Sequence, residues 1–310
     1  MLLIKNGRIK TMAGNDVENG CVLIDKTSGK IVSVGQHVVE TADMEIIDAG
    51  GRLVTPGCVE AHCHIGFGDL SGNDHNESSA PITPEMRAID GINPHNEAFG
   101  NAIKGGVTTV CTGPGSANII GGTFAAIKCY GNRIDDMIVK NPAAMKVAFG
   151  ENPKKYHAQG GKTVKTRMAI AAHLREFLYQ AKKYYDDKKA GNNPAFNFQL
   201  EAMLPVMSGE IPLKAHAHRA DDIFTAIRIA KEFGLKLTLD HCTDGALIAD
   251  ALAKEGYPAF VGPSMGGKSK HELLNKGFKT PAALHMAGVD IAIITDAGVI
   301  QIEYLPLVAG

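Results

Sequence analysis

From residue 57 to the end of the chain, short strand-like runs alternate with helical stretches, and this alternation restricts the fold more than any other feature. Alternation of this kind predicts parallel strands joined by crossover helices. With 310 residues, the chain is long enough for one α/β barrel with an appendage. The strand candidates are GCVEAHCHI, GVTTVCTG, MKVAFG, PLKAHAH, KLTLDHC, AFVGPS and DIAIITD. An eighth strand is not evident; the competing segments are AAIKCY, DMIV and the poor strand PAFNFQ.

The first 55 residues have a different pattern, in which short apolar runs are separated by turn signals. Asn6-Gly7 and Ser28-Gly29 lie between β-rich runs, and a Pro-Gly pair closes the segment. Asn-Gly and Ser-Gly at such places are hairpin signals, so we expect a small antiparallel sheet. The predicted domains are therefore a small β domain, residues 1–55, and an α/β barrel, residues 56–310.

For two of the connecting helices, the sequence predicts where the helix begins and where it ends. Residues 166–189 carry apolar side chains at helical spacing and end in the charged run KKYYDDKK. For the second helix, Asp221 or Asp222 is the expected N-cap and Gly234 marks the expected end.

The first barrel strand has one polar face. Alternation places Glu60, His62 and His64 on one side of GCVEAHCHI and apolar residues on the other. Because the outer face of a barrel packs on helices, we expect the histidines to point inward, at the carboxyl end where barrel active sites lie. A His-x-His pair alone is a weak signal, since a chain with 12 histidines produces such pairs by chance.

Three later strands also end in residues that bind metals. PLKAHAH carries Lys214, His216 and His218 on one face. KLTLDHC has its leucines and His241 on the inward face, and DIAIITD ends in Asp296. Imidazole and carboxylate groups suit a borderline divalent ion such as zinc. A single histidine of this kind is more often structural, but the order of the set along four strands favours a metal site.

These motifs resemble the amidohydrolase superfamily. The resemblance rests on CVEAHCHIG after a leader ending in LVTPG, and then on AHAH, LDHC and ITDAG. GVTTVCTGPGSANIIGG and FGENPKK are similar to imidazolonepropionase-related and prolidase-like members. The resemblance implies two pairs of metal ligands, His62 with His64 and His216 with His241. It also implies that Asp296 contacts the first metal and acts as general acid/base.

The fold that this resemblance implies is an α/β fold, a distorted (β/α)8 TIM-type barrel with a small N-terminal β-sandwich-like domain. Members of the family usually continue past the last barrel strand with strands that complete the small domain. This chain ends 14 residues after Asp296, so we expect those strands to be missing and the leading sheet to leave apolar surface uncovered.

A two-metal site of this family also needs a bridging carboxylate. Glu151, at the end of MKVAFGE, is the candidate ligand, although a loop charge paired with Lys154 or Lys155 is an almost equal interpretation. If Glu151 is not a ligand, a carbamylated Lys146 or Lys214 could replace it, or the site holds one metal.

The expected cofactor is one or two divalent metal ions, zinc by preference, and the expected activity is hydrolysis of a C–N bond in an amide or cyclic amide. Zinc lowers the pKa of bound water and polarises a carbonyl group, so hydroxide attacks and Asp296 passes the proton to the leaving nitrogen. Two alternatives stay open: a mononuclear deaminase or imidazolonepropionase-like enzyme, and a non-catalytic, metal-free barrel scaffold.

Two further residues are predicted to contact substrate, His218 and Ser264. Ser264 lies in GPSMG, which matches the G-x-S-x-G motif of serine hydrolases. The partners of that motif do not fit, because no histidine follows Asp290 or Asp296. We therefore interpret Ser264 as part of a substrate-facing loop after a barrel strand.

Two loops are candidates for covering the site. GPGSANIIGG, residues 113–122, lacks the glycine spacing of a nucleotide-binding loop and is expected to lie over the metal. Residues 69–97 are polar without periodicity, so they form either an active-site lid or plain surface. In the first case His75 and His95 would face substrate.

Composition excludes several classes of partner. The net charge is -1 and aromatic residues are 6% of the chain, which argues against nucleic-acid binding. Six scattered cysteines without a C-x-x-C favour a reduced compartment, and no apolar run reaches the length of a signal peptide or membrane span. We expect a cytoplasmic enzyme for a small molecule, with no nucleic-acid or membrane partner, as a monomer or a homo-oligomer.

Overall fold

The computed structural model describes residues 1–69, 72–158 and 164–310. It contains two compact units, Met1–Gly57 and Cys58–Gly310. The strands of the first unit are β1 (Leu2–Ile9), β2 (Val17–Asp25), β3 (Lys30–Gly35), β4 (Glu45–Asp48) and β5 (Leu53–Val54). They form one sheet in the order β3-β2-β1-β4, in which β5 also pairs with β1.

The first sheet is mixed, and the expectation of a purely antiparallel sheet was wrong. β2 runs antiparallel to β1 and β3, whereas β4 and β5 run parallel to β1. The reason is the connection over residues 36–44, which is long enough to carry the chain back beside β1 in the parallel direction.

One of the two turn signals in this unit makes a hairpin. Ser28 and Gly29 lie between β2 and β3, with Gly29 at a φ of +69°. Asn6, by contrast, lies inside β1 at a φ of +56°, where the register to β2 shifts between Ile4 and Gly7. An Asn-Gly pair thus produces an irregularity of the strand here and not a turn.

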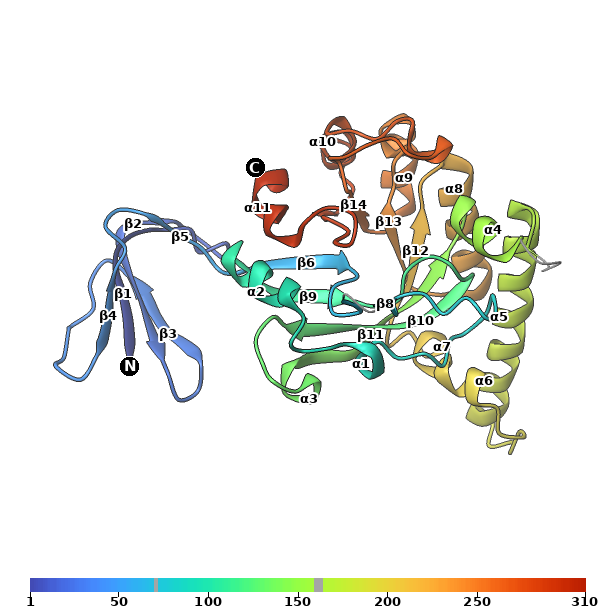
Figure 1. Cartoon of the computed structure of the whole chain (residues 1–310), viewed down its shortest axis with the longest axis horizontal. Helices are drawn as coiled ribbons and strands as arrows, with labels where there is room; N and C mark the ends of the chain where they lie inside the picture. The colour runs from blue at the N-terminus through green and yellow to red at the C-terminus, as the bar shows by residue number, and fades with distance from the viewer. Residues whose placement is uncertain (70–71, 159–163) are drawn as a thin grey trace. The chain divides into compact units, whose positions relative to one another are not determined.

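The second unit is built on an eight-stranded sheet with the order β15-β14-β13-β12-β11-β10-β9-β6 (Figure 1). Its strands are β6 (Cys58–Cys63), β9 (Val107–Thr112), β10 (Ile120–Lys128), β11 (Ile138–Ala148), β12 (Leu213–Ala217), β13 (Leu237–His241), β14 (Ala259–Val261) and β15 (Ile291–Ile293). A separate small ribbon consists of β7 (Gly68–Asp69) and β8 (Gly72–Asn73).

The eighth barrel strand is β10, and it is the exception to the parallel order. β10 runs antiparallel to both β9 and β11, while the other neighbours pair in parallel. Only residues 113–119 separate β9 from β10, which is too short for the crossover that a parallel pair needs. The candidate AAIKCY contributes to β10 and DMIV to the start of β11, whereas PAFNFQ contains no strand.

The two ends of this sheet meet near the carboxyl ends of their strands. The His64 amide donates to the Ala297 carbonyl at 2.6 Å and links the segments after β6 and β15. The buried Glu60 carboxylate accepts from the amide of Thr295 at 2.8 Å and from its hydroxyl at 2.6 Å. The sheet is therefore a nearly closed eight-stranded barrel.

The two helices predicted with both ends are α5 (Arg167–Lys189) and α8 (Ala220–Phe233). α8 packs against β12 and β13, and α5 packs against α8 (Figure 1). As predicted, α8 ends at Gly234, which has a φ of +66°. The expected aspartate cap of α8 was wrong: the N-cap is Arg219, and the Asp222 carboxylate accepts from Arg167 instead.

The remaining helices are short. They are α1 (Ala88–Gly91), α2 (Glu97–Lys104), α3 (Ile134–Met137), α4 (Glu151–His157), α6 (Phe198–Ala202), α7 (Leu204–Met207), α9 (Ala249–Glu255), α10 (Lys279–Met286) and α11 (Leu305–Ala309), with 3-10 turns η2 (Gly245–Leu247), η3 (His271–Leu273) and η4 (Ile302–Tyr304). Within the described ranges, none of the helices has the length and apolar character to cross a bilayer.

The orientation of β13 differs from the prediction. Leu237 and Leu239 belong to the apolar core that includes Ile223 and Ile227 of α8, so they do not fill the barrel interior. Asp240, between Leu239 and His241, forms ion pairs inside the barrel. His241 nevertheless reaches the same interior, because its φ of +73° breaks the alternation of the strand.

Candidate metal centre

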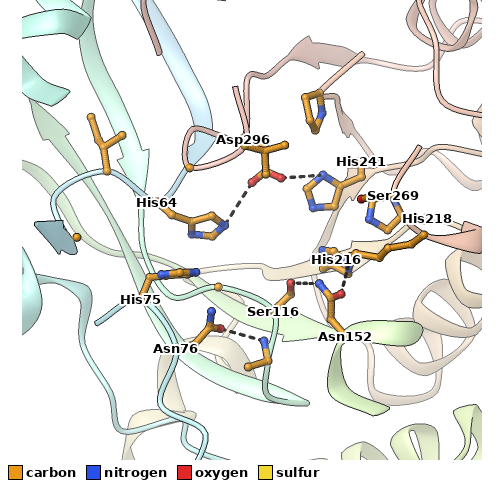
Figure 2. Close-up of a pocket in the computed structure, with 18 of the residues that line it drawn as sticks. His64, His75, Asn76, Ser116, Asn152, His216, His218, His241, Ser269 and Asp296 are labelled. Carbon is orange, nitrogen blue, oxygen red and sulfur yellow. Dashed lines mark hydrogen bonds and ion pairs between the residues drawn. The ribbon is translucent and has the colours of Figure 1, made fainter. Parts of the chain in front are cut away.

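Histidines and one aspartate from four strand ends meet at the carboxyl end of the barrel. Figure 2 shows His64, His216, His218, His241 and Asp296 directed toward one cavity. Two groups of three potential ligands are present, and within each group the ligand atoms all lie within 4.8 Å of one another. The first group is His216, His218 and His241, and the second is His62, His241 and Asp296. These groups contain five of the predicted site residues. One of the five is His218, which was predicted to contact substrate and lies with His216 and His241.

Hydrogen bonds fix how these rings face the cavity. His64 Nδ1 lies 2.8 Å from the Gly113 carbonyl, and His241 Nδ1 lies 2.8 Å from the Gly262 carbonyl. Since a carbonyl only accepts, each Nδ1 carries the proton and leaves Nε2 with a lone pair. This is the arrangement by which proteins orient metal-binding imidazoles.

The buried imidazoles are held in the neutral form. Burial lowers the pKa of His62 to about 3. Burial also lowers the pKa of His216 and of His218 well below the ordinary histidine value. Neutral imidazole is the form that binds metals.

Asp296 is the carboxylate of the site. Its Oδ1 lies 3.4 Å from His62 Nε2 and 3.3 Å from His64 Nε2, and its Oδ2 lies 4.0 Å from His241 Nδ1. Burial raises the pKa of Asp296, but its electrostatic interactions with His241, His62 and His64 outweigh burial and hold that pKa well below its usual range. Asp296 is therefore an ionised acceptor at the cavity.

At this site, buried polar atoms without hydrogen-bond partners point to an additional group. His216 Nε2 and Asp296 Oδ1 make no hydrogen bond with the residues that the structure describes. Buried polar atoms rarely stay unsatisfied, and nitrogen and carboxylate oxygen are the ligands that zinc and similar ions prefer. The donor set therefore fits one or two divalent ions.

Below the histidines lies a buried charge network that the sequence reading missed. Asp240 Oδ1 accepts from Lys214 at 2.8 Å, and its Oδ2 accepts from Lys146 at 3.2 Å. Asp240 Oδ2 also lies 3.1 Å from His62 Nδ1. Asp240 thereby orients His62, so that His62 Nε2 faces Asp296.

Glu151, the predicted bridging ligand, has a different environment. Its Oε1 accepts from the Glu272 amide at 3.1 Å, and its amide donates to Glu272 Oε2 at 2.9 Å. Glu151 belongs to neither ligand group, and no described ion pair joins it to Lys154 or Lys155. The group beside His62 is instead Lys146, whose Nζ lies 3.5 Å from His62 Nε2.

The cavity over these ligands has a volume of about 490 Å³. Residues of the 113–122 loop line it, as does His75 from the segment that was interpreted as lid or surface (Figure 2). His95 is exposed and is not part of the described wall. Ser264 lines a small adjoining hollow, and Ser269 of the same loop faces the main cavity.

Comparison with known proteins identifies the family. No protein-family model matches the sequence. An amidohydrolase of known structure from Thermotoga maritima is 38% identical, with a TM-score of 0.94 over 100% of this chain and 82% of that one. Amidohydrolase tasK of Hapsidospora irregularis is 31% identical over 253 residues, which are 73% of this chain but only a quarter (25%) of tasK. Imidazolonepropionase of Staphylococcus aureus is 48% identical over 54 residues, 17% of this chain and 13% of that protein. The chain belongs to the amidohydrolase superfamily.

Proposed function

We propose that the protein is a divalent-metal-dependent hydrolase of carbon–nitrogen bonds in amides or cyclic amides. The observation that carries the proposal is the meeting of neutral imidazoles with one ionised carboxylate at the end of the barrel, where His216 Nε2 and Asp296 Oδ1 lack hydrogen-bond partners among the described residues. The family membership supports the same class of reaction.

The proposed ligand sets are those that the family resemblance implies, and the closeness of the side chains supports them. His62, His64 and Asp296 would hold one ion, since both Nε2 atoms lie within 3.4 Å of Asp296 Oδ1. His216 and His241 would hold a second ion. Lys146 lies fully buried beside His62, where a carbamylated lysine would supply a further carboxylate; in this structure its ammonium group pairs with Asp240.

The chemistry divides between the ion and Asp296. A divalent ion at this site supplies a Lewis acid that polarises a carbonyl group and lowers the pKa of water. Asp296, ionised and facing the cavity, accepts the proton of the attacking water and returns it to the leaving nitrogen. The neutral, metal-facing histidines have no lone pair left for that task, and the cavity of about 490 Å³ suits a small molecule.

Asp296→Asn tests the proposal. The variant keeps the shape of the side chain but removes the base, so we expect metal content to persist while turnover falls by about 10²–10⁴-fold. Elemental analysis and a panel of lactams, N-acyl amino acids and Xaa-Pro dipeptides measure the two effects. His241→Ala is the companion variant, and it should lose bound metal. Activity of Asp296→Asn within a few-fold of wild type would remove Asp296 from the mechanism.

A one-metal enzyme of the deaminase or imidazolonepropionase-like kind is the second candidate. The 54-residue match to imidazolonepropionase favours it, together with the placement of Glu151 away from the ligand groups. The metal stoichiometry of the purified protein separates one ion from two. A stoichiometry near zero after growth with added zinc or manganese would instead favour a metal-free scaffold.

A further inference from the structure

The wall of the cavity has more positively charged than negatively charged side chains. The lysines in its described wall are Lys155, Lys270 and Lys276, and the one acid there is Asp296, which the proposed metal site employs. The buried imidazoles beside them add no positive charge, since they are neutral. The wall outside the metal ligands is therefore cationic, which favours an anionic ligand.

The three lysines differ in how well their charge is matched. Lys270 Nζ lies 3.5 Å from Glu272 Oε1 and donates to Asn152 Oδ1, so a carboxylate already faces it. Lys155 is exposed at the surface of α4. Lys276 Nζ makes neither a hydrogen bond nor an ion pair with any residue in the described ranges. Lys276 is the partly buried cation of the wall that lacks a partner.

Lys276 lines the part of the cavity that contains the proposed metal ligands. It lines the main cavity with Asp296 and His241, and it also lines the adjoining hollow. Its Nζ is bounded on one side by the backbone of Gly266, where an added Cβ would lie 3.4 Å away. Burial lowers the pKa of Lys276, and the charge of Asp296 partly opposes this effect.

We propose that Lys276 binds a carboxylate of the substrate, and that the preferred substrates are acyl-amino acids or cyclic amides with a free carboxylate. The inference rests on the proposed hydrolase and adds the substrate class to it. A lysine ammonium is a compact charge that makes strong, charge-assisted hydrogen bonds to carboxylates. Asp296 and the imidazoles would take the amide end of such a molecule, and Lys276 its acid end.

Calorimetric titration of the metal-loaded protein tests this assignment. The probes are two matched pairs, N-acetyl-L-leucine with N-acetyl-L-leucinamide and L-pyroglutamate with its carboxamide. We expect each carboxylate to bind about tenfold more tightly than its amide, as one charged hydrogen bond allows. Lys276→Met should abolish this preference, and Lys276→Arg should keep most of it.

Lys279→Met is the matched control. Lys279 begins α10 three residues further on, is exposed and does not line the described cavity, so this variant removes the same charge without touching the proposed subsite. It should keep the full preference. A carboxylate could also bind the metal directly, and a preference that persists in Lys276→Met would show this and overturn the assignment.

Hydrolysis of the same pairs separates this inference from the proposed activity. In Lys276→Met, KM for the N-acetyl amino acid should rise about tenfold while kcat changes less than about threefold. Preferential binding without any turnover would count against the hydrolase and leave the subsite standing. Turnover without preference, or no binding of either carboxylate at millimolar concentration, would overturn the subsite.

Discussion

Two buried clusters of charge in the barrel unit have opposite compositions. We name them by their central acids: the Asp240 cluster contains Asp240, Lys146, Lys214 and His62, and the Glu272 cluster contains Glu272, Asp222, Glu151 and Arg167. In the first, two lysines face one carboxylate. In the second, three carboxylates gather near Arg167 and near Lys270, whose Nζ lies 3.5 Å from Glu272 Oε1.

The acids of the two clusters respond differently to burial. Burial raises the pKa of Asp240, but His62 and the two lysines outweigh burial and hold that pKa well below its usual range. Burial also raises the pKa of Glu272 and of Asp222, and here the nearby cations do not reverse the effect. Glu151 and Asp222 also raise the pKa of Glu272, so the balance of cations and acids beside a buried carboxylate, and not its depth alone, sets the direction of its pKa shift.

The two clusters also differ in how their oxygens are satisfied. Both oxygens of Asp240 accept from lysines, and the cluster supports His62 from below. Glu272 Oε1 makes no hydrogen bond in the described part of the chain, although His218 Nε2 lies 3.9 Å away. The Asp240 cluster is thus a closed structural support, whereas the Glu272 cluster carries excess negative charge next to His218.

Asp240→Asn should break the first cluster and have the largest effect on stability. The change removes the carboxylate that both buried lysines share, and breaking a buried pair costs about 3–5 kcal/mol of unfolding free energy. Urea denaturation measures the loss. Asp135→Asn is the control, because Asp135 is exposed and lies 3.9 Å from Arg133, so its removal should leave stability nearly unchanged. Wild-type stability in Asp240→Asn would mean that the lysines do not depend on Asp240.

The sequence predicts the inward-facing histidines of β6 and β12. His62 and His216 are buried on the faces that alternation predicts, although the register of β6 to β9 shifts between Glu60 and Cys63. Asp240 could not be found in this way, since alternation puts Asp240 and His241 on opposite faces. The left-handed backbone at His241 sends both side chains inward, and a single residue with positive φ leaves no periodic signal in the sequence.

The antiparallel β10 shows a second limit. Its glycines make it look like a loop, yet Gly122 has a φ of +114° and a Cβ there would lie 2.3 Å from the Met86 carbonyl. Glycine is required at this position by contact with a segment about 36 residues earlier, as the Thr123 amide, which donates to the same carbonyl, also shows. Long-range packing of this kind cannot be read from local propensity.

Gly150→Ala should strain the second cluster, with a smaller effect. An added Cβ would lie 2.6 Å from Glu272 Oε2 and 3.1 Å from Asp222 Oδ2, at a φ of +84°. We expect a loss of about 1–3 kcal/mol in unfolding free energy. Gly191→Ala is a close control, because its φ is +79° and nothing lies within 4 Å of its Cβ. The difference between the two losses measures the crowding of the carboxylates, and equal losses would contradict it.

Glu272→Gln should have the smallest effect on the free energy of unfolding. The sign of that effect tests whether the Glu272 cluster carries excess negative charge. Because the folded pKa of Glu272 is raised above 4.5, the folded state keeps this proton to higher pH than the unfolded chain does. Ionised Glu272 therefore costs stability, and the cost grows as pH rises from that value through the raised pKa. Gln removes the charge but still accepts from the Glu151 amide.

We expect Glu272→Gln to exceed wild type in unfolding free energy at pH 7, by on the order of 1 kcal/mol, and to match it near pH 4. Urea unfolding across this range measures the difference. Glu201→Gln should have the opposite sign at neutral pH, because hydrogen bonds from Lys188 and Tyr184 lower the pKa of Glu201. If Glu272→Gln were less stable than wild type at pH 7, Arg167 and Lys270 would compensate Glu272 fully, and the two clusters would not differ in kind.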